Sequence, residues 1–163
     1  MNPPAVFRCR FFCLLAGSVA TGSTQAQLVI SEVCTKNNGV LVDGFGDTPD
    51  WIEVQNIGST AIDLSDYYLS DDINDPGEWQ LPDEGLAPSE VVVFYSNDDN
   101  SGDHYFPFKI ERNGETIHLA NSTLQVVQSI PVPYLHADHS FGLLGAGSYF
   151  FADPTPNVVN NTT

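Results

Sequence analysis

Four carboxylates between residues 43 and 53 have the type and spacing to hold a cation. Calcium takes about six to eight oxygen ligands from carboxylates, carbonyls and water, and a flexible acidic loop can supply them. The segment lacks the Asp-x-Asp-x-Asp-Gly order and the distal Glu of an EF-hand, so such a site would be loosely built. We therefore predict a calcium site at Asp43, Asp47, Asp50 and Glu53, and no other cofactor.

Two further acidic loops, residues 71–75 and 98–103, could bind calcium in the same way. Asp and Asn are also common turn formers, because their side chains accept hydrogen bonds from the neighbouring backbone. A turn without a cation is therefore the alternative for all three loops. The first loop is the strongest candidate, because its carboxylates converge on Trp51 and Glu53.

A pair of carboxylates for general acid–base catalysis is the second chemistry to consider. Asp50 and Glu53 lie three residues apart beside an expected strand, so alternation points them to opposite faces and they do not form a pair. Glu32 and Glu53 could meet across neighbouring strands, where they would repel each other unless a proton or a cation lay between them. The sequence does not decide between a proton and a cation at this position.

The segment of residues 136–140 contains residue types that occur in zinc sites and hydrolase triads. Zinc sites usually need a further ligand on a rigid element, and no His-Glu-x-x-His motif is present. Side chains adjacent in sequence also cannot adopt the geometry of a nucleophile, a base and an orienting acid. The chain has no Gly-rich phosphate loop either. We predict a surface loop here, no catalytic residues and no enzymatic activity.

Short β-strands must position these residues. The apolar runs are rich in Val, Ile, Phe and Tyr, are separated by Gly, Pro, Asn and Asp, and show no sustained helical period, as in a sandwich or barrel. The predicted strands cover residues 28–33, 51–56, 61–64, 67–70, 78–81, 91–95, 108–110, 116–119, 124–130, 140–143 and 149–151. The chain is therefore predicted to be all-β.

Two local patterns give more detail. Residues 91–95 are apolar on both faces, which predicts a strand in the middle of the core. Asn113-Gly114 favours a tight turn, and we predict a hairpin that joins residues 108–110 to residues 116–119.

Four aromatic residues lie beside the acidic loops. Trp51 and Tyr68 are expected in the core, as is usual for such residues in a sandwich. For Tyr67 and Trp79 the sequence allows two locations, either in the core or on a surface that binds sugars or a basic partner.

The first 26 residues resemble an export signal. Two arginines precede an apolar run at residues 11–16, which is too short to span a bilayer, and a small-residue stretch ends at Ala26. Cleavage after Ala26 would place the remaining chain outside the cell, in the periplasm or at the cell surface. It would also leave Cys34 as the one thiol, which we expect to be buried and unreactive.

The charge of the chain restricts its partners. After cleavage, Lys36, Lys109 and Arg112 would remain against 21 Asp and Glu residues. Such a surface repels phosphate groups. We therefore expect neither nucleic acid nor membrane insertion, and predict a protein or surface ligand of unidentified nature.

A series of short motifs runs in order through most of the chain. They are Leu28-Val29-Ile30-Ser31-Glu32-Val33, Asp47-x-x-Asp50-Trp51-Ile52-Glu53, Asn56-x-Gly58, Asp63-Leu64-Ser65, Leu69-Ser70-Asp71-Asp72, Trp79, Leu86-Ala87-Pro88, Gly114-Glu115, Ser140-Phe141-Gly142 and Thr155-Pro156. Together they resemble the lamin-tail domain as it occurs in secreted bacterial proteins.

The resemblance implies an immunoglobulin-like β-sandwich over residues 27–163 with a mostly non-catalytic role. Bacterial members are commonly joined to other secreted modules, including hydrolases. The chain departs from the family pattern at Asp66 and Asn157, where Gly is usual, and at Leu143, where a basic residue is common.

We therefore expect a secreted, non-catalytic module for protein or surface interaction. The alternatives are a calcium-dependent adhesion or accessory module and a secreted hydrolase.

Overall fold

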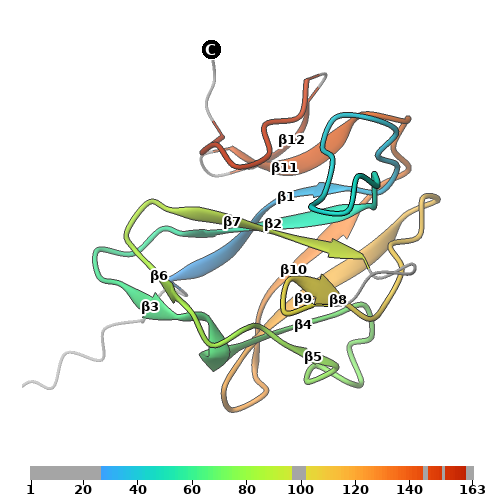
Figure 1. Cartoon of the computed structure of the whole chain (residues 1–163). Helices are drawn as coiled ribbons and strands as arrows, with labels where there is room; N and C mark the ends of the chain where they lie inside the picture. The colour runs from blue at the N-terminus through green and yellow to red at the C-terminus, as the bar shows by residue number, and fades with distance from the viewer. Residues whose placement is uncertain (1–26, 97–101, 145–146, 152, 161–163) are drawn as a thin grey trace, which may run out of the picture.

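The computed structural model describes residues 27–96, 102–144, 147–151 and 153–160. The predicted export signal, residues 1–26, lies outside the described residues, as does most of the acidic loop at residues 98–103. The strands form two larger sheets that face each other, with a short two-stranded ribbon at one end (Figure 1). One 3-10 turn, η1 (Leu64–Asp66), links the ribbon to the second sheet.

The first sheet has six strands in the order β12-β11-β1-β2-β7-β8. Neighbouring strands run antiparallel, except that β7 and β8 are parallel. The strands are β1 (Leu28–Cys34), β2 (Trp51–Asn56), β7 (Val91–Ser96), β8 (Tyr105–Phe106), β11 (Ser140–Leu144) and β12 (Gly147–Phe151). The first and last strands of the described chain therefore belong to one sheet, with β11 between them.

The second sheet has four strands in the order β10-β9-β4-β5. The ribbon pairs two short strands that are neighbours in space but not consecutive in sequence. The strands are β4 (Tyr67–Ser70), β5 (Trp79–Gln80), β9 (Glu115–Asn121) and β10 (Val126–Val132), with β3 (Ile62–Asp63) and β6 (Gly85–Leu86) in the ribbon.

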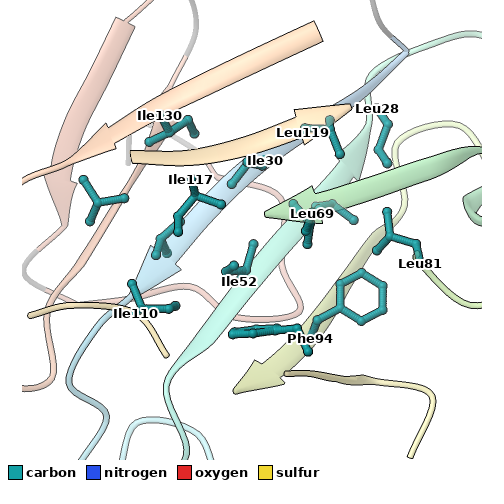
Figure 2. Packing of buried hydrophobic residues seen from close by; sticks show 14 of the residues in the cluster. Leu28, Ile30, Ile52, Leu69, Leu81, Phe94, Ile110, Ile117, Leu119 and Ile130 are labelled. Carbon is teal, nitrogen blue, oxygen red and sulfur yellow. The ribbon is translucent and has the colours of Figure 1, made fainter. Parts of the chain in front are cut away.

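The main core lies between the two sheets. Two alternate residues of β2, Ile52 and Val54, point into it. Ile52 lies in the same cluster as Ile117 and Leu119 of β9 (Figure 2). Phe94 of β7 fills the same layer and is fully buried. Alternation with one face inward is what a sandwich requires, because successive side chains of a strand point to opposite faces. The predicted all-β, immunoglobulin-like sandwich is confirmed.

The predicted hairpin between residues 108–110 and 116–119 is wrong. Residues 108–110 belong to no strand, and β9 pairs with β4 and β10 instead. The Asn113-Gly114 turn does form, with Gly114 at φ +105° and its N–H donating to the Glu111 carbonyl at 3.0 Å. A turn signal fixes the local backbone, but it does not determine which strand pairs with the next.

The environment of β7 is partly as predicted. Val92 and Phe94 face the main core, while Val93 and Tyr95 join a second, smaller apolar cluster on the opposite face of the sheet. Both faces are therefore covered, but β1 and β2 occupy the middle of the sheet.

The aromatic residues also differ in part from expectation. Trp51 is fully buried, in the second cluster with Cys34 and Val93. Tyr67 packs against the main core, whereas Tyr68 alternates to the other face of β4. Trp79 contacts the ring of Phe94 edge-on, with 5.1 Å between ring centroids, and so belongs to the core edge.

A β-bulge in β1 changes which of its residues face the core. Leu28 and Ile30 point inward, so strict alternation would send Glu32 inward too. The register shifts between Ile30 and Glu32, and Val33 enters the core instead. A bulge adds one residue and reverses the faces beyond it. Glu32 therefore lies on the outer face of the sheet, directly opposite Glu53 of β2.

The bulge also brings the backbone of β1 very close to β11. Gly142 lies opposite Glu32, and a Cβ added at Gly142 would collide with the carbonyl oxygen of Ser31. We predict that Gly142→Ala lowers the free energy of unfolding by about 2 kcal/mol, because a rigid backbone must move to admit the methyl group. Gly39→Ala is the control, since nothing lies within 4 Å of the added atom. Equal denaturation midpoints for the two variants would contradict this close approach.

Candidate functional site

Glu32 and Glu53 form a buried carboxylate pair, defined here as these two side chains on the outer face of β1 and β2. Both have zero exposure to solvent. They are cross-strand partners in the antiparallel ladder, so their Cβ atoms are direct neighbours. The sequence had suggested that the two could meet, and the bulge in β1 is what brings them to the same face.

Hydrogen-bond donors surround both carboxylates. Glu53 accepts from the hydroxyl of Ser31 at 2.7 Å and from the backbone N–H of Asn157 at 2.7 Å. Glu32 accepts from the hydroxyl of Ser140 and from the backbone N–H of Thr155 at 3.1 Å. Buried carboxylates without such donors would be strongly unfavourable.

Half of these donors come from the C-terminal strap, defined as residues 153–160. Within the strap, the Asn160 side-chain amide donates to the carbonyls of Ser31 and Leu143, each at 3.0 Å. The Asn160 side-chain oxygen lies 2.7 Å from the Thr155 hydroxyl, which donates to it. The strap therefore crosses the bulge of β1 and the end of β11, in the red C-terminal region of Figure 1.

The departure of Asn157 from the usual Gly has a backbone explanation. Asn157 adopts φ +65°, the left-handed region that Gly favours and that Asn tolerates best among the other residues. This conformation accompanies the N–H hydrogen bond to Glu53. Asn157 therefore adopts the backbone conformation that this position of the strap has, without a Gly.

The electrostatics of the pair favour one bound proton near neutral pH. Burial raises the pKa of Glu53 to about 7, against the hydrogen bonds from Ser31 and Asn157, which lower it. The negative charge of Glu32 raises it further. Burial also raises the pKa of Glu32, with Ser140 and Thr155 opposing the change. A proton relieves the repulsion expected of two adjacent carboxylates.

The buried carboxylate pair is placed to hold the fold rather than to meet a substrate. General acid–base catalysis needs a carboxylate within hydrogen-bond reach of a reacting group. Here both side chains are fully covered, and Ser31, Ser140 and the strap donate hydrogen bonds to them. The pair therefore joins β1, β2, β11 and the strap.

The segment between β1 and β2 forms an ordered loop, residues 35–50, held by Asn37. The side-chain oxygen of Asn37 accepts from the backbone N–H groups of residues 39–41. Its amide donates to the carbonyls of Leu41 at 2.6 Å and Pro49 at 2.9 Å. Its backbone N–H donates to Asp50 at 3.1 Å. Asn37 thus ties both ends of the loop together.

Asp43 organises the tip of this loop. One carboxylate oxygen accepts from the N–H groups of Phe45 and Asp47, each at 2.9 Å. The other accepts from the hydroxyl of Tyr105 in β8, also at 2.9 Å. Burial raises the pKa of Asp43, but these bonds together lower it below its usual value. Burial and the neighbouring Asp43 raise the pKa of Tyr105 to about 12, so its hydroxyl stays a donor.

Three aromatic rings lie beside Asp43. Tyr105 is flanked by Phe45, with 6.0 Å between centroids, and by Tyr95, with 5.5 Å. Phe45 is 64% exposed at the tip of the loop. The sequence gives no signal for this arrangement, because β8 follows the loop by more than fifty residues.

The four residues of the predicted calcium site have different surroundings. Asp43 and Asp47 lie together at the loop tip, Asp50 binds the Asn37 backbone, and Glu53 lies beneath the strap. Among the residues that the structure describes, no group of three or more His, Cys, Asp or Glu side chains is arranged to hold a metal ion. Calcium binding stays a prediction.

The other sequence candidates have ordinary surroundings. In the loop at residues 71–75, Asp72 accepts from the backbone N–H of Asn74 at 2.8 Å, as a turn-forming residue does. The rings of His136 and His139 lie 6.0 Å apart. Cys34 is the one cysteine in the part of the chain that the structure describes, and it is buried as a free thiol. Burial raises its pKa to about 12, so its thiolate is not populated at neutral pH.

Two facing, mostly antiparallel sheets with this core define an immunoglobulin-like β-sandwich. A family model, the Lamin Tail Domain, matches residues 21–133, and the chain belongs to that family. No curated protein and no solved structure matches. Strands β11 and β12 follow the matched region and complete the six-stranded sheet, and the strap follows them. Within the described residues, no helix is long and apolar enough to cross a membrane.

The buried carboxylate pair predicts an unusual pH dependence of stability. The pKa of Glu53 is about 7 in the folded chain and 4.5 as a reference, so the folded state binds the proton more tightly. The contribution of Glu53 to the free energy of unfolding should then be fully present below pH 4.5 and fall by about 3 kcal/mol as pH rises to about 7. Glu53→Gln, which stays neutral, should remove this contribution and leave the contributions of Glu115, whose pKa burial also raises to about 7, and of Glu32. Urea denaturation between pH 4.5 and 8 measures the difference.

The matched control is Asp83→Asn, which removes an equal charge from an exposed position. It should keep the pH dependence of the wild type. If Glu53→Gln and Asp83→Asn gave parallel curves, the protonated pair would be refuted and the general negative charge would explain the fall.

Proposed function

We propose that this chain is a secreted, non-catalytic lamin-tail module that binds a protein or a surface partner. The observation that carries the proposal is that the strap covers the buried carboxylate pair. Glu32 and Glu53 are fully buried, so their chemistry serves the fold. A lamin-tail sandwich then acts through the surface that it presents.

The surface charge favours a cationic partner. The chain carries 21 acidic residues against 5 Lys and Arg, a formal net charge of −16. A field of this sign attracts basic segments and repels phosphate groups and anionic lipids. The composition of the chain therefore favours a partner that carries positive charge.

Binding is tested with the secreted product of the full chain and three synthetic peptides of equal length, one cationic, one neutral and one anionic. We expect calorimetric titration to show binding of the cationic peptide, with an affinity that falls as salt is added. A module that binds none of the three would contradict a cationic partner. Turnover of ester, glycoside or phosphodiester substrates would instead favour the hydrolase alternative.

A calcium-dependent adhesion or accessory module is the second candidate, supported by the proximity of Asp43 and Asp47 at the loop tip. An extracellular site with Kd near ~10⁻⁴ M would stabilise the fold by about 1 kcal/mol at millimolar calcium. We therefore expect chelation to lower the melting temperature measured by calorimetry, with magnesium at equal ionic strength as control. An unchanged melt in calcium would exclude this candidate.

Export is tested separately. The full chain with a C-terminal tag should appear outside the cytoplasm with Gln27 as its first residue, as expected for cleavage after Ala26. Mass spectrometry of the purified product identifies that residue. A cytoplasmic product that retains residues 1–26 would contradict the proposed localisation.

A further inference from the structure

We propose that the outer edge of β12 pairs antiparallel with the same edge of a second copy of this chain. The outer edge is the side of β12 that faces away from β11. β12 is the end strand of the six-stranded sheet, in red in Figure 1, and no described strand pairs with that side. An end strand presents backbone N–H and C=O groups that another strand can bind. The inference concerns self-association and is independent of the cationic partner proposed above.

The other strands at the edges of the described sheets are protected against such pairing. Strands β3, β5, β6 and β8 contain two residues each. Strand β10 contains seven residues, but Pro131 has no N–H to donate, and the register shifts between Val126 and Gln128. Short length, proline and bulges are devices by which proteins prevent pairing at a sheet edge.

Strand β12 has none of these devices. It pairs with β11 through five consecutive residues without a register shift, and it contains no proline. Residues 140–151, which include both strands, contain no charged residue, although the chain carries 21 Asp and Glu. A charge on the strand is a further way to prevent pairing. Among the described edges, β12 is therefore the one left open to another strand.

The side chains of β12 are open on both faces of the sheet. Tyr149 is 52% exposed and Phe150 is 62% exposed, and as neighbours in a strand they point to opposite faces. The strap binds residues of β1, β2 and β11. A strand added at the edge would therefore place its own side chains beside these aromatic rings, and cross-strand aromatic pairs contribute to stability.

A second copy is the occupant that fits best. Its own β12 has the same length and no charge, so pairing satisfies both edges at once and brings no carboxylate into the contact. In a two-fold antiparallel pair centred on Tyr149, each Tyr149 lies opposite its copy. Because each copy has one open edge, the assembly closes at two. The net charge of −16 on each copy opposes association, so added salt should favour the dimer.

The test measures the mass of the secreted product by sedimentation over a range of protein concentrations. We expect a monomer–dimer equilibrium that shifts towards the dimer when salt is added. Tyr149→Glu and Tyr149→Lys each place like charges opposite each other, and each should raise the dissociation constant of the dimer by about tenfold. An equimolar mixture of the two variants pairs opposite charges and should restore the dimer. A purely structural role of Tyr149 would not allow this rescue.

The matched controls are Tyr134→Glu and Tyr134→Lys, which make the same changes at a tyrosine that is 46% exposed outside β12. Both should dimerise within about twofold of wild type. Hydrogen exchange locates the contact, because the backbone N–H groups of residues 148–151 should exchange more slowly as the protein concentration rises.

Each outcome supports or overturns the pairing. Loss of the dimer in each Tyr149 variant and its recovery in the mixture support it. A product that stays monomeric at every concentration, or a dimer that both Tyr149 variants leave unchanged, overturns it. Association beyond two copies overturns the closed pair. A monomer in which the cationic peptide slows exchange at residues 148–151 assigns the edge to that partner instead. Failure of the peptide to bind contradicts only the proposed function, because the dimer is measured without it.

Discussion

The bulge in β1 is the constraint on which the outer face of the six-stranded sheet depends. One extra residue between Ile30 and Glu32 moves Glu32 away from the core and places it opposite Glu53. The same shift admits Val33 to the core and turns Cys34 toward Trp51. Without it, alternation would put a carboxylate among the apolar residues of the main core, at a large desolvation cost.

The buried carboxylate pair then requires partners, and the C-terminal strap supplies them. Two adjacent carboxylates inside a protein are tolerated when a proton and enough donors accompany them. Thr155 and Asn157 donate backbone N–H groups, and Ser31 and Ser140 donate hydroxyls. Residues beyond the family match thus complete the sheet that the matched region begins.

The acidic loop between β1 and β2 has a different role from the pair, although Glu53 follows it directly in sequence. Its carboxylates organise backbone: Asp43 holds the loop tip, and Asp50 accepts from the N–H of Asn37. The result is a rigid support from which Phe45 projects beside Tyr105. The carboxylates of the pair therefore stabilise the sandwich, while Asp43 and Asp50 order the loop.

The sequence by itself determined the all-β class, most strands, the resemblance to the lamin-tail family and the burial of Trp51, because alternation and turn residues are local signals. It also included a contact between Glu32 and Glu53 among the predicted arrangements. The hairpin at residues 108–110 was wrong, and the contacts of Thr155 and Tyr105 were not foreseen. Only the tertiary structure decided those, because strand order, the register shift at Ile30 and pairs such as Asp43 and Tyr105 depend on residues far apart in the chain.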